Sequence, residues 1–123
     1  MTNQAQSSKL QKYDLEERTA IFGEKVIKFV KQLTEDSINR PLINQLIRSA
    51  TSIGANYMEA DGANSKQDFN HKISICKKEA KETLHWLRMV AVANVQYKEI
   101  CRELWKESHE FVLIFSAILK KRK

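Results

Sequence analysis

Apolar residues recur every three or four positions along four stretches of the chain, the spacing that lines one face of an α-helix. One proline and three glycines leave little material for the turns of a fold with many strands. Short connections make successive helices antiparallel neighbours. The pattern therefore predicts an all-α, antiparallel up-down-up-down four-helix bundle. The four stripes are Phe22, Val26, Phe29, Val30 and Leu33; Ile43, Leu46, Ile47, Ala50, Ile53 and Tyr57; Phe69, Ile73, Cys76, Ala80, Leu84, Leu87 and Ala91; and Tyr97, Cys101, Leu104, Ser108, Phe111, Phe115 and Ile118.

Capping and helix-breaking residues mark the expected ends of the helices. Asp14, with Glu17 three residues later, resembles a capping box and places the start of the first helix just after Asp14. Pro41 suits the first turn of the second helix, where a missing N–H removes no intrahelical bond. Gly62 suits the position just past the end of that helix, and Ser65 suits the N-cap of the third.

The net charge of +6 is confined to the two ends of the chain. Residues 13–119, the predicted bundle, contain 15 Lys and Arg against 15 Asp and Glu, so their charges cancel. Lys9 and Lys12 lie in residues 1–12, a polar stretch without periodicity that predicts a disordered tail. The other four cations form residues 120–123, a basic tail that concentrates the positive field where it emerges.

Composition also indicates the compartment. No apolar run approaches the roughly 18 residues that a membrane span needs, and residues 1–12 have no apolar core like that of a secretory signal. Two cysteines, Cys76 and Cys101, lie on the apolar stripes and fit a reducing compartment as small buried residues. We therefore expect a cytoplasmic protein with no membrane partner.

Histidines and carboxylates do not repeat in the pattern of a metal centre. A di-metal site in a bundle needs Glu-x-x-His on two helices, with further carboxylates facing inward. Glu82 with His85 supplies one such pair, and Asp68 with His71 is a weaker version on the same helix. The cysteines stand away from helix starts near cations, where thiolates form, and the glycines are too scattered for a phosphate loop. We expect no cofactor, no metal and no enzymatic activity.

Polar residues follow one face of the second helix and one face of the third. If these helices turn near Ala63, positions equally far from the turn lie level, so Arg48 meets Glu79 and Glu82, while Lys72 approaches Glu59. The alternatives are solvated faces with incidental ion pairs, or a partly buried network that sets helix register or joins subunits. We call this set the polar ladder; its members are Arg48, Ser52, Asn56, Glu59, Lys72, Glu79 and Glu82.

Opposite charges also stand close together along the fourth helix. Glu99, Glu103 and Glu107 lie beside Arg102 and Lys106 in the sequence. Because residues three apart are neighbours on a helix surface, this spacing predicts ion pairs along its solvent-exposed face.

Two further features raise the question of a second buried surface. The segment 49–55 of the second helix is rich in small residues, which let another helix approach closely, either within the bundle or across a subunit contact. Trp86 and Trp105 lie off the main stripes of their helices. A large aromatic in such a place marks either an oligomer interface or an edge that widens the core of the monomer.

The segment Arg48–Ala60 resembles the second-helix signature of the four-helix-bundle proteins of the 23S rRNA intervening-sequence family. The likeness extends over residues 14–119, and the chain departs from it at Asp61, where many members carry a Glu-Gly pair directly after the alanine. The signature is Ser-Ile-x-x-Asn-x-x-Glu at Ser52, Ile53, Asn56 and Glu59, supported by Ser65-Lys66-Gln67-Asp68-Phe69, Lys78-Glu79-x-x-Glu82 and Trp86-Leu87.

The resemblance implies a homopentamer of bundles around a central channel. It also implies kinship with accessory proteins of diversity-generating retroelements, which work beside a reverse transcriptase and nucleic acid. The family name refers to reading frames inside inserts of ribosomal RNA genes and is not itself a function.

Two binding functions fit these observations. One is a homo-oligomeric scaffold, most simply a pentamer, that binds RNA or DNA non-specifically; the other is an adaptor that docks a protein partner such as a reverse transcriptase. In the first, cations of the third helix and of the tail contact phosphates rather than bases. These candidate contacts are Lys77, Lys81, Lys120, Lys121, Arg122 and Lys123.

Overall fold

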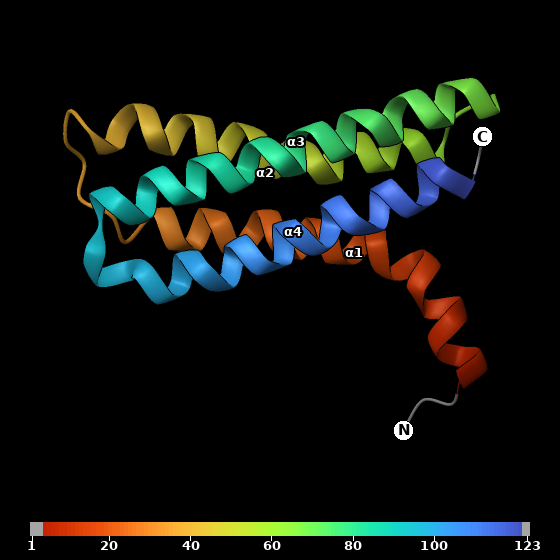
Figure 1. Ribbon diagram of the computed structural model, residues 1–123, viewed down its shortest axis with the longest axis horizontal. Helices are drawn as coiled ribbons and strands as arrows, with labels where there is room; N and C mark the ends of the chain where they lie inside the picture. Colours follow the sequence, from red (N-terminus) through yellow and green to blue (C-terminus); the bar gives the residue numbers. More distant parts are fainter. Residues whose placement is uncertain (1–3, 122–123) are drawn as a thin grey trace.

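Four antiparallel α-helices and one short 3-10 turn make up the part of the chain that the structure describes (Figure 1). The computed structural model describes the backbone of residues 4–121 and the side chains of residues 15–121. The predicted all-α bundle is confirmed. Its elements are α1 (Gln4–Val30), α2 (Asn39–Asp61), α3 (Lys66–Ala93), η1 (Val95–Tyr97) and α4 (Lys98–Lys121).

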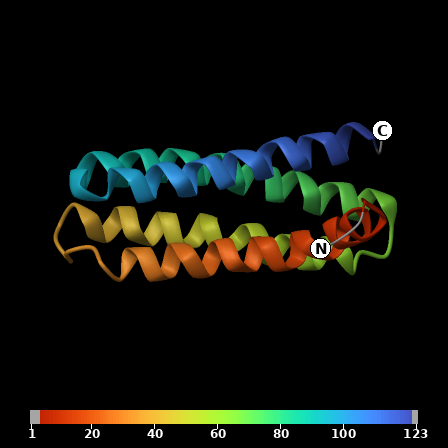
Figure 2. The same cartoon turned by 90° about the horizontal axis from the view of Figure 1, so that it is seen from below.

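The helices are arranged in two layers, with α1 beside α2 and α3 beside α4 (Figure 2). Each helix packs on the next one in the chain, and α2 against α3 is the most extensive of these contacts. Helix α1 touches α4 far less than it touches α2. Helices α1 and α4 are therefore less closely packed than the other neighbouring pairs, and a surface groove follows the seam between them.

Both ends of the bundle differ from the sequence-based boundaries. Helix α1 begins at Gln4 and runs through Asp14, so the start predicted after Asp14, with a disordered 1–12 tail before it, is wrong for residues 4–12. This segment has no apolar stripe, but glutamine, alanine and lysine are good helix formers without one. Helix α4 continues to Lys121, so Lys120 and Lys121 are helical, and Arg122 and Lys123 lie outside the described residues.

The predicted helix caps are largely present. The Ser65 hydroxyl accepts a hydrogen bond from the Asp68 backbone N–H at 3.0 Å, and Gly62 directly follows α2. The start of α2 also has a cap that the sequence analysis missed. The Asp36 carboxylate accepts hydrogen bonds from the backbone N–H groups of Ile38 at 3.0 Å and Asn39 at 2.7 Å. Short-range capping rules thus place three of the helix ends.

The small residues of α2 serve the packing inside the bundle. Ser49 and Ala50 are fully buried. A Cβ atom added to Gly54 would lie 3.2 Å from the Thr19 hydroxyl oxygen, and one added to Gly23 would lie 3.6 Å from the Thr51 methyl group. Helices α1 and α2 therefore approach each other through small side chains. Of the two alternatives for segment 49–55, the contact within the bundle accounts for Ser49, Ala50 and Gly54.

A pair of buried asparagines joins the two layers at one end of the molecule. The side-chain amides of Asn39, at the start of α2, and Asn94, after α3, exchange hydrogen bonds of 3.0 and 2.9 Å. Each amide also donates to a carbonyl, Asn39 to Thr34 and Asn94 to Val90. All of these polar groups are satisfied out of water, so removing one amide leaves the other unpaired.

We expect Asn94→Ala to lower the free energy of unfolding by about 2 kcal/mol, because it strands the buried Asn39 amide. Urea unfolding followed by circular dichroism measures this change. The matched control is Asn44→Ala at an exposed site on α2, which should shift stability by at most about 0.5 kcal/mol. Equal effects of the two variants would contradict a structural role for the asparagine pair.

Candidate functional site

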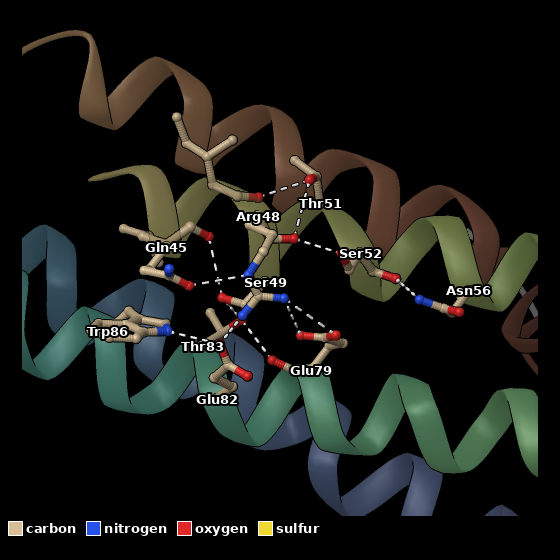
Figure 3. A network of polar contacts seen from close by, with 12 residues as sticks. Gln45, Arg48, Ser49, Thr51, Ser52, Asn56, Glu79, Glu82, Thr83 and Trp86 are labelled. Carbon is tan, nitrogen blue, oxygen red and sulfur yellow. Dashed lines mark hydrogen bonds and ion pairs between the residues drawn. The ribbon is translucent and has the colours of Figure 1, made fainter. Parts of the chain in front are cut away.

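The first part of the polar ladder forms where α2 crosses α3 (Figure 3). The Arg48 guanidinium lies 3.2 Å from a Glu79 carboxylate oxygen and also pairs with Glu82. Its Nε donates to the side-chain oxygen of Gln45 at 3.1 Å. Glu79 is 9% exposed, so Arg48 supplies the opposite charge that a nearly buried carboxylate requires.

The second part of the polar ladder lies nearer the α2–α3 turn. The Lys72 ammonium donates to a Glu59 carboxylate oxygen at 2.7 Å, and this hydrogen bond, together with the negative charge, raises the pKa of Lys72. Ser52 and Asn56 do not bridge the helices. Their side chains donate to carbonyls of α2 itself, Ser52 to Arg48 at 2.6 Å and Asn56 to Ser52 at 2.8 Å. The ladder therefore consists of two separate ion-pair clusters.

A buried polar contact lies beside the first cluster and was missed by the sequence analysis. The hydroxyls of Ser49 on α2 and Thr83 on α3 are 2.9 Å apart and fully buried. A third buried hydroxyl, that of Ser108, donates to the Ala80 carbonyl at 2.9 Å and so joins α4 to α3. Serine and threonine can occupy positions inside an apolar stripe, so periodicity alone gives no sign of these bonds.

The candidate metal pair on α3 is divided between different contacts. Glu82 accepts from Arg48 and from the Trp86 indole N–H, the latter at 3.0 Å, while His85 packs edge-on against the Trp86 ring. Across residues 15–121, no three metal-binding side chains gather. The carboxylates of this region thus hold helices together rather than converge on a site.

The two cysteines are isolated in the core. Burial raises the pKa of Cys76 to about 12 and that of Cys101 to about 11. Both thiols are free and buried, and the Cys76 thiol donates to the Ile53 carbonyl at 3.6 Å. At neutral pH both are thiols rather than the reactive thiolates.

Charges are segregated along α4. Glu107 faces α1, where the Arg18 guanidinium makes two hydrogen bonds of 2.8 Å to its carboxylate. Glu103 also lines the α1–α4 seam, whereas Arg102 lines the side toward α3. None of the ion pairs predicted along α4 forms among the described residues. The carboxylates and most of the cations point to different sides of the helix.

The outer surface of α3 and α4 is consequently basic. On α3, Lys77, Lys81 and Arg88 follow one another at helical spacing, and a groove between the helices continues this line of cations. No carboxylate lines this groove, and its cations form no ion pair among the described residues. We call this surface the basic face; its cations are Lys77, Lys81, Arg88, Lys98, Arg102 and Lys106.

The two tryptophans have different surroundings. Trp86 is half-buried against the core, and its indole N–H is satisfied by Glu82. These contacts fit the alternative of an edge that widens the monomer core. Trp105 lies in the groove of the basic face and is 37% exposed. Sequence position alone could not separate them, because both lie off their helices' main stripes.

Two further surfaces carry exposed apolar side chains. The open seam between α1 and α4 contains a groove of about 640 Å³ with Ile21 on its wall. The outer surface of α1 and α2 exposes Ile27 and Met58 beside Glu16 and Glu24. Exposed apolar side chains gathered on one surface are typical of protein contacts.

Residues 11–117 match the family model described as 23S rRNA-intervening sequence protein. The chain belongs to that family. A similar solved structure is the crystal structure of a protein with unknown function from the S23 ribosomal protein family of Bacteroides thetaiotaomicron. It shares 30% sequence identity and a TM-score of 0.75, over 86% of this chain and 98% of the other.

No curated protein matches this family member. Among the described residues, no helix combines the length and the apolar character that crossing a bilayer requires. The family predicted from the second-helix signature is thus confirmed, while the kinship with retroelement accessory proteins stays a prediction.

We expect Arg48→Ala to lower the free energy of unfolding by about 1–3 kcal/mol, because it leaves the nearly buried Glu79 carboxylate without its cation. Lys72→Ala is the control, since it breaks the more exposed ion pair to Glu59 and should shift the urea midpoint less. If Lys72→Ala proved as damaging as Arg48→Ala, burial would not be what makes the first cluster important.

Proposed function

We propose that this protein is a non-enzymatic, homo-oligomeric scaffold that binds nucleic acid non-specifically through the basic face. The observation that carries the proposal is the arrangement of cations from α3 and α4 around a groove that no carboxylate lines. The charges of residues 13–119 sum to zero. This basic surface therefore arises because cations and carboxylates lie on different sides of the bundle, and not from an excess of cations. A polyanion is the ligand that such a surface favours.

Lysine and arginine side chains at such spacings read phosphates rather than bases. Lys81 and Arg88 are exposed along α3, and Lys120 and Lys121 extend the positive charge along the last turn of α4. Arg122 and Lys123 follow in the sequence. Binding to phosphates gives affinity without base specificity and depends steeply on salt.

Self-association uses the two apolar surfaces that the basic face leaves free. A ring needs two different faces on each copy, and the α1–α4 seam and the outer surface of α1 and α2 meet along α1. Adjacent faces of a four-helix bundle stand at roughly a right angle, which turns each copy by about 90° relative to the last. Such a turn closes a small ring, of four copies at about 90° or five at about 72°, whereas opposite faces stack copies in a line. We propose the homopentamer, because five is the number of copies that the family resemblance implies.

Absence of enzymatic activity is part of the proposal. The buried thiols have raised pKa values, and the carboxylates Glu79 and Glu82 are committed to Arg48. These groups offer neither an activated nucleophile nor a free acid–base pair.

The second candidate is an adaptor with no role in nucleic-acid binding. The observation that favours it is the acidic, apolar surface of α1 and α2, which exposes Ile27 and Met58 and lies in the layer opposite the basic face. In this case the basic face binds an acidic protein surface, on a second copy or on a partner such as a reverse transcriptase.

We expect the double variant Lys81→Glu, Arg88→Glu to bind a mixed-sequence single-stranded oligonucleotide at least about 10-fold more weakly at 0.1 M salt. The dependence of log K on log salt should become less steep by roughly 1.4, because two phosphate contacts with a single strand are lost. Fluorescence anisotropy across a salt series measures both quantities.

The control for this comparison is Lys31→Glu, Arg40→Glu, which changes the net charge equally at exposed sites near the α1–α2 connection. A chain ending at Leu119 tests the C-terminal cations in the same assay. If both charge-reversed proteins lost affinity equally, net charge rather than the basic face would account for binding.

We expect light scattering at micromolar protein to give about 72 kDa, five times the chain mass of 14.3 kDa. The variant Ile27→Glu, Met58→Glu should give smaller species, because it places charge in an apolar contact. Val92→Glu, at an exposed site at the end of α3, is the control and should keep the assembly. A wild-type mass near that of one chain would exclude the ring.

A further inference from the structure

The groove of the basic face combines an exposed aromatic ring with cations. It has a volume of about 500 Å³ and lies between the second half of α3 and the first half of α4. Leu87, Ala91 and Cys101 give it an apolar floor, and Trp105 stands on its wall. The four cations that complete its lining are Arg88, Lys98, Arg102 and Lys106. This volume is within the range of roughly 300–1,000 Å³ that accepts small-molecule groups.

One face of the Trp105 ring is stacked on a side chain of its own helix. The His109 imidazole, one turn further along α4, stacks on the indole with ring centroids 5.1 Å apart and an angle of 15° between the ring planes. A ring held in this way loses little conformational entropy when a ligand binds it. Trp86 has no comparable exposure, since it packs on the core and donates to Glu82. Trp105 is therefore the aromatic ring available on the basic face.

We propose that this groove binds single-stranded nucleic acid, with one unstacked base lying against Trp105 and its flanking phosphates on the surrounding cations. The inference rests on the proposed function and adds the class of nucleic acid and the residue that selects it. Every base has a π-face, so stacking on an indole tolerates any sequence. A base inside a duplex is already stacked and paired, so it cannot reach the groove without paying for unstacking.

The chemistry of the groove favours this occupant over another protein. Its cations form no ion pair among the described residues, which leaves them free to contact phosphates. Two copies of the same groove would bring four cations against four, which disfavours a symmetric contact between basic faces. An apolar helix laid into the groove would also need to neutralise these charges. A single strand of nucleotides matches both features of the groove: its flat bases suit the apolar floor and Trp105, and its regularly spaced negative charges suit the cations.

Trp105→Ala tests the proposal in the full-length chain, with a mixed-sequence 12-nucleotide DNA, the matching RNA and the DNA duplex as probes. We expect the variant to bind both single strands about 10-fold more weakly, with duplex affinity changed less than about 2-fold. The salt slope should stay unchanged, because no phosphate contact is removed. Trp105→Phe, which keeps an aromatic ring, should recover part of the lost affinity.

Fluorescence supplies a second readout that does not depend on truncating the ring. In Trp86→Phe, Trp105 is the only tryptophan of the chain, and we expect single strands to quench its emission while the duplex does not. Trp86→Phe itself should bind like the wild type. Circular dichroism and light scattering verify the fold and the assembly of each variant.

The possible outcomes separate this inference from the proposed function. If the wild type binds in a salt-dependent way but Trp105→Ala binds single strands as tightly, the stacking role is overturned while the scaffold stands. If the wild type binds no nucleic acid, the proposed function fails first. A change in oligomeric mass confined to Trp105→Ala would show that a second copy of the chain fills the groove, which also overturns the proposal.

Discussion

The packing of α2 against both of its neighbours is the constraint on which the rest of the molecule depends. Ser49 and Ala50 bury completely, and Gly54 lies so close to Thr19 that an added Cβ would be tightly crowded. Helix α2 packs against α3 as well as α1, and at the α2–α3 contact the nearly buried Glu79 requires Arg48 beside it. Close approach and the buried charge are thus parts of one arrangement: the first brings α1 to α2, and the second aligns α2 with α3.

In this arrangement the surface of α4 is the one least constrained by packing against other helices. Helix α4 packs mainly on α3 and touches α1 little, so its two flanks can differ. Glu107 and Glu103 lie toward the α1–α4 seam, while Arg102 and Trp105 lie on the flank toward α3. A helix with mixed charges in its sequence can therefore carry a surface of one sign in the folded protein.

Much of the fold follows from local rules, whereas the surfaces do not. The apolar stripes, Pro41, Gly62 and Ser65 predict the helices and most of their ends, since periodicity and capping act within a few residues. The contact of Arg48 with Glu79 follows from antiparallel register alone. The basic face was predicted only for Lys77 and Lys81 of α3. The approach of Arg88 to Arg102 depends on the register between α3 and α4, which the sequence analysis did not apply to these two residues. The ion pairs expected along α4 do not form for a related reason, since Glu107 pairs with Arg18 of α1.

The asparagine pair at the end of the bundle has a consequence for how the two halves of the chain assemble. Each helical hairpin carries one amide, and each amide has satisfied partners only when α2 and the end of α3 are correctly aligned. A hairpin displaced by one turn would bury two unsatisfied amides, a penalty that an apolar pair would not impose. Such a polar contact discriminates between registers more than it adds to stability, as a single buried asparagine does in a coiled coil. Slipped or exchanged hairpins are thereby disfavoured, and the charge pattern on the outer surface is reproduced in every copy.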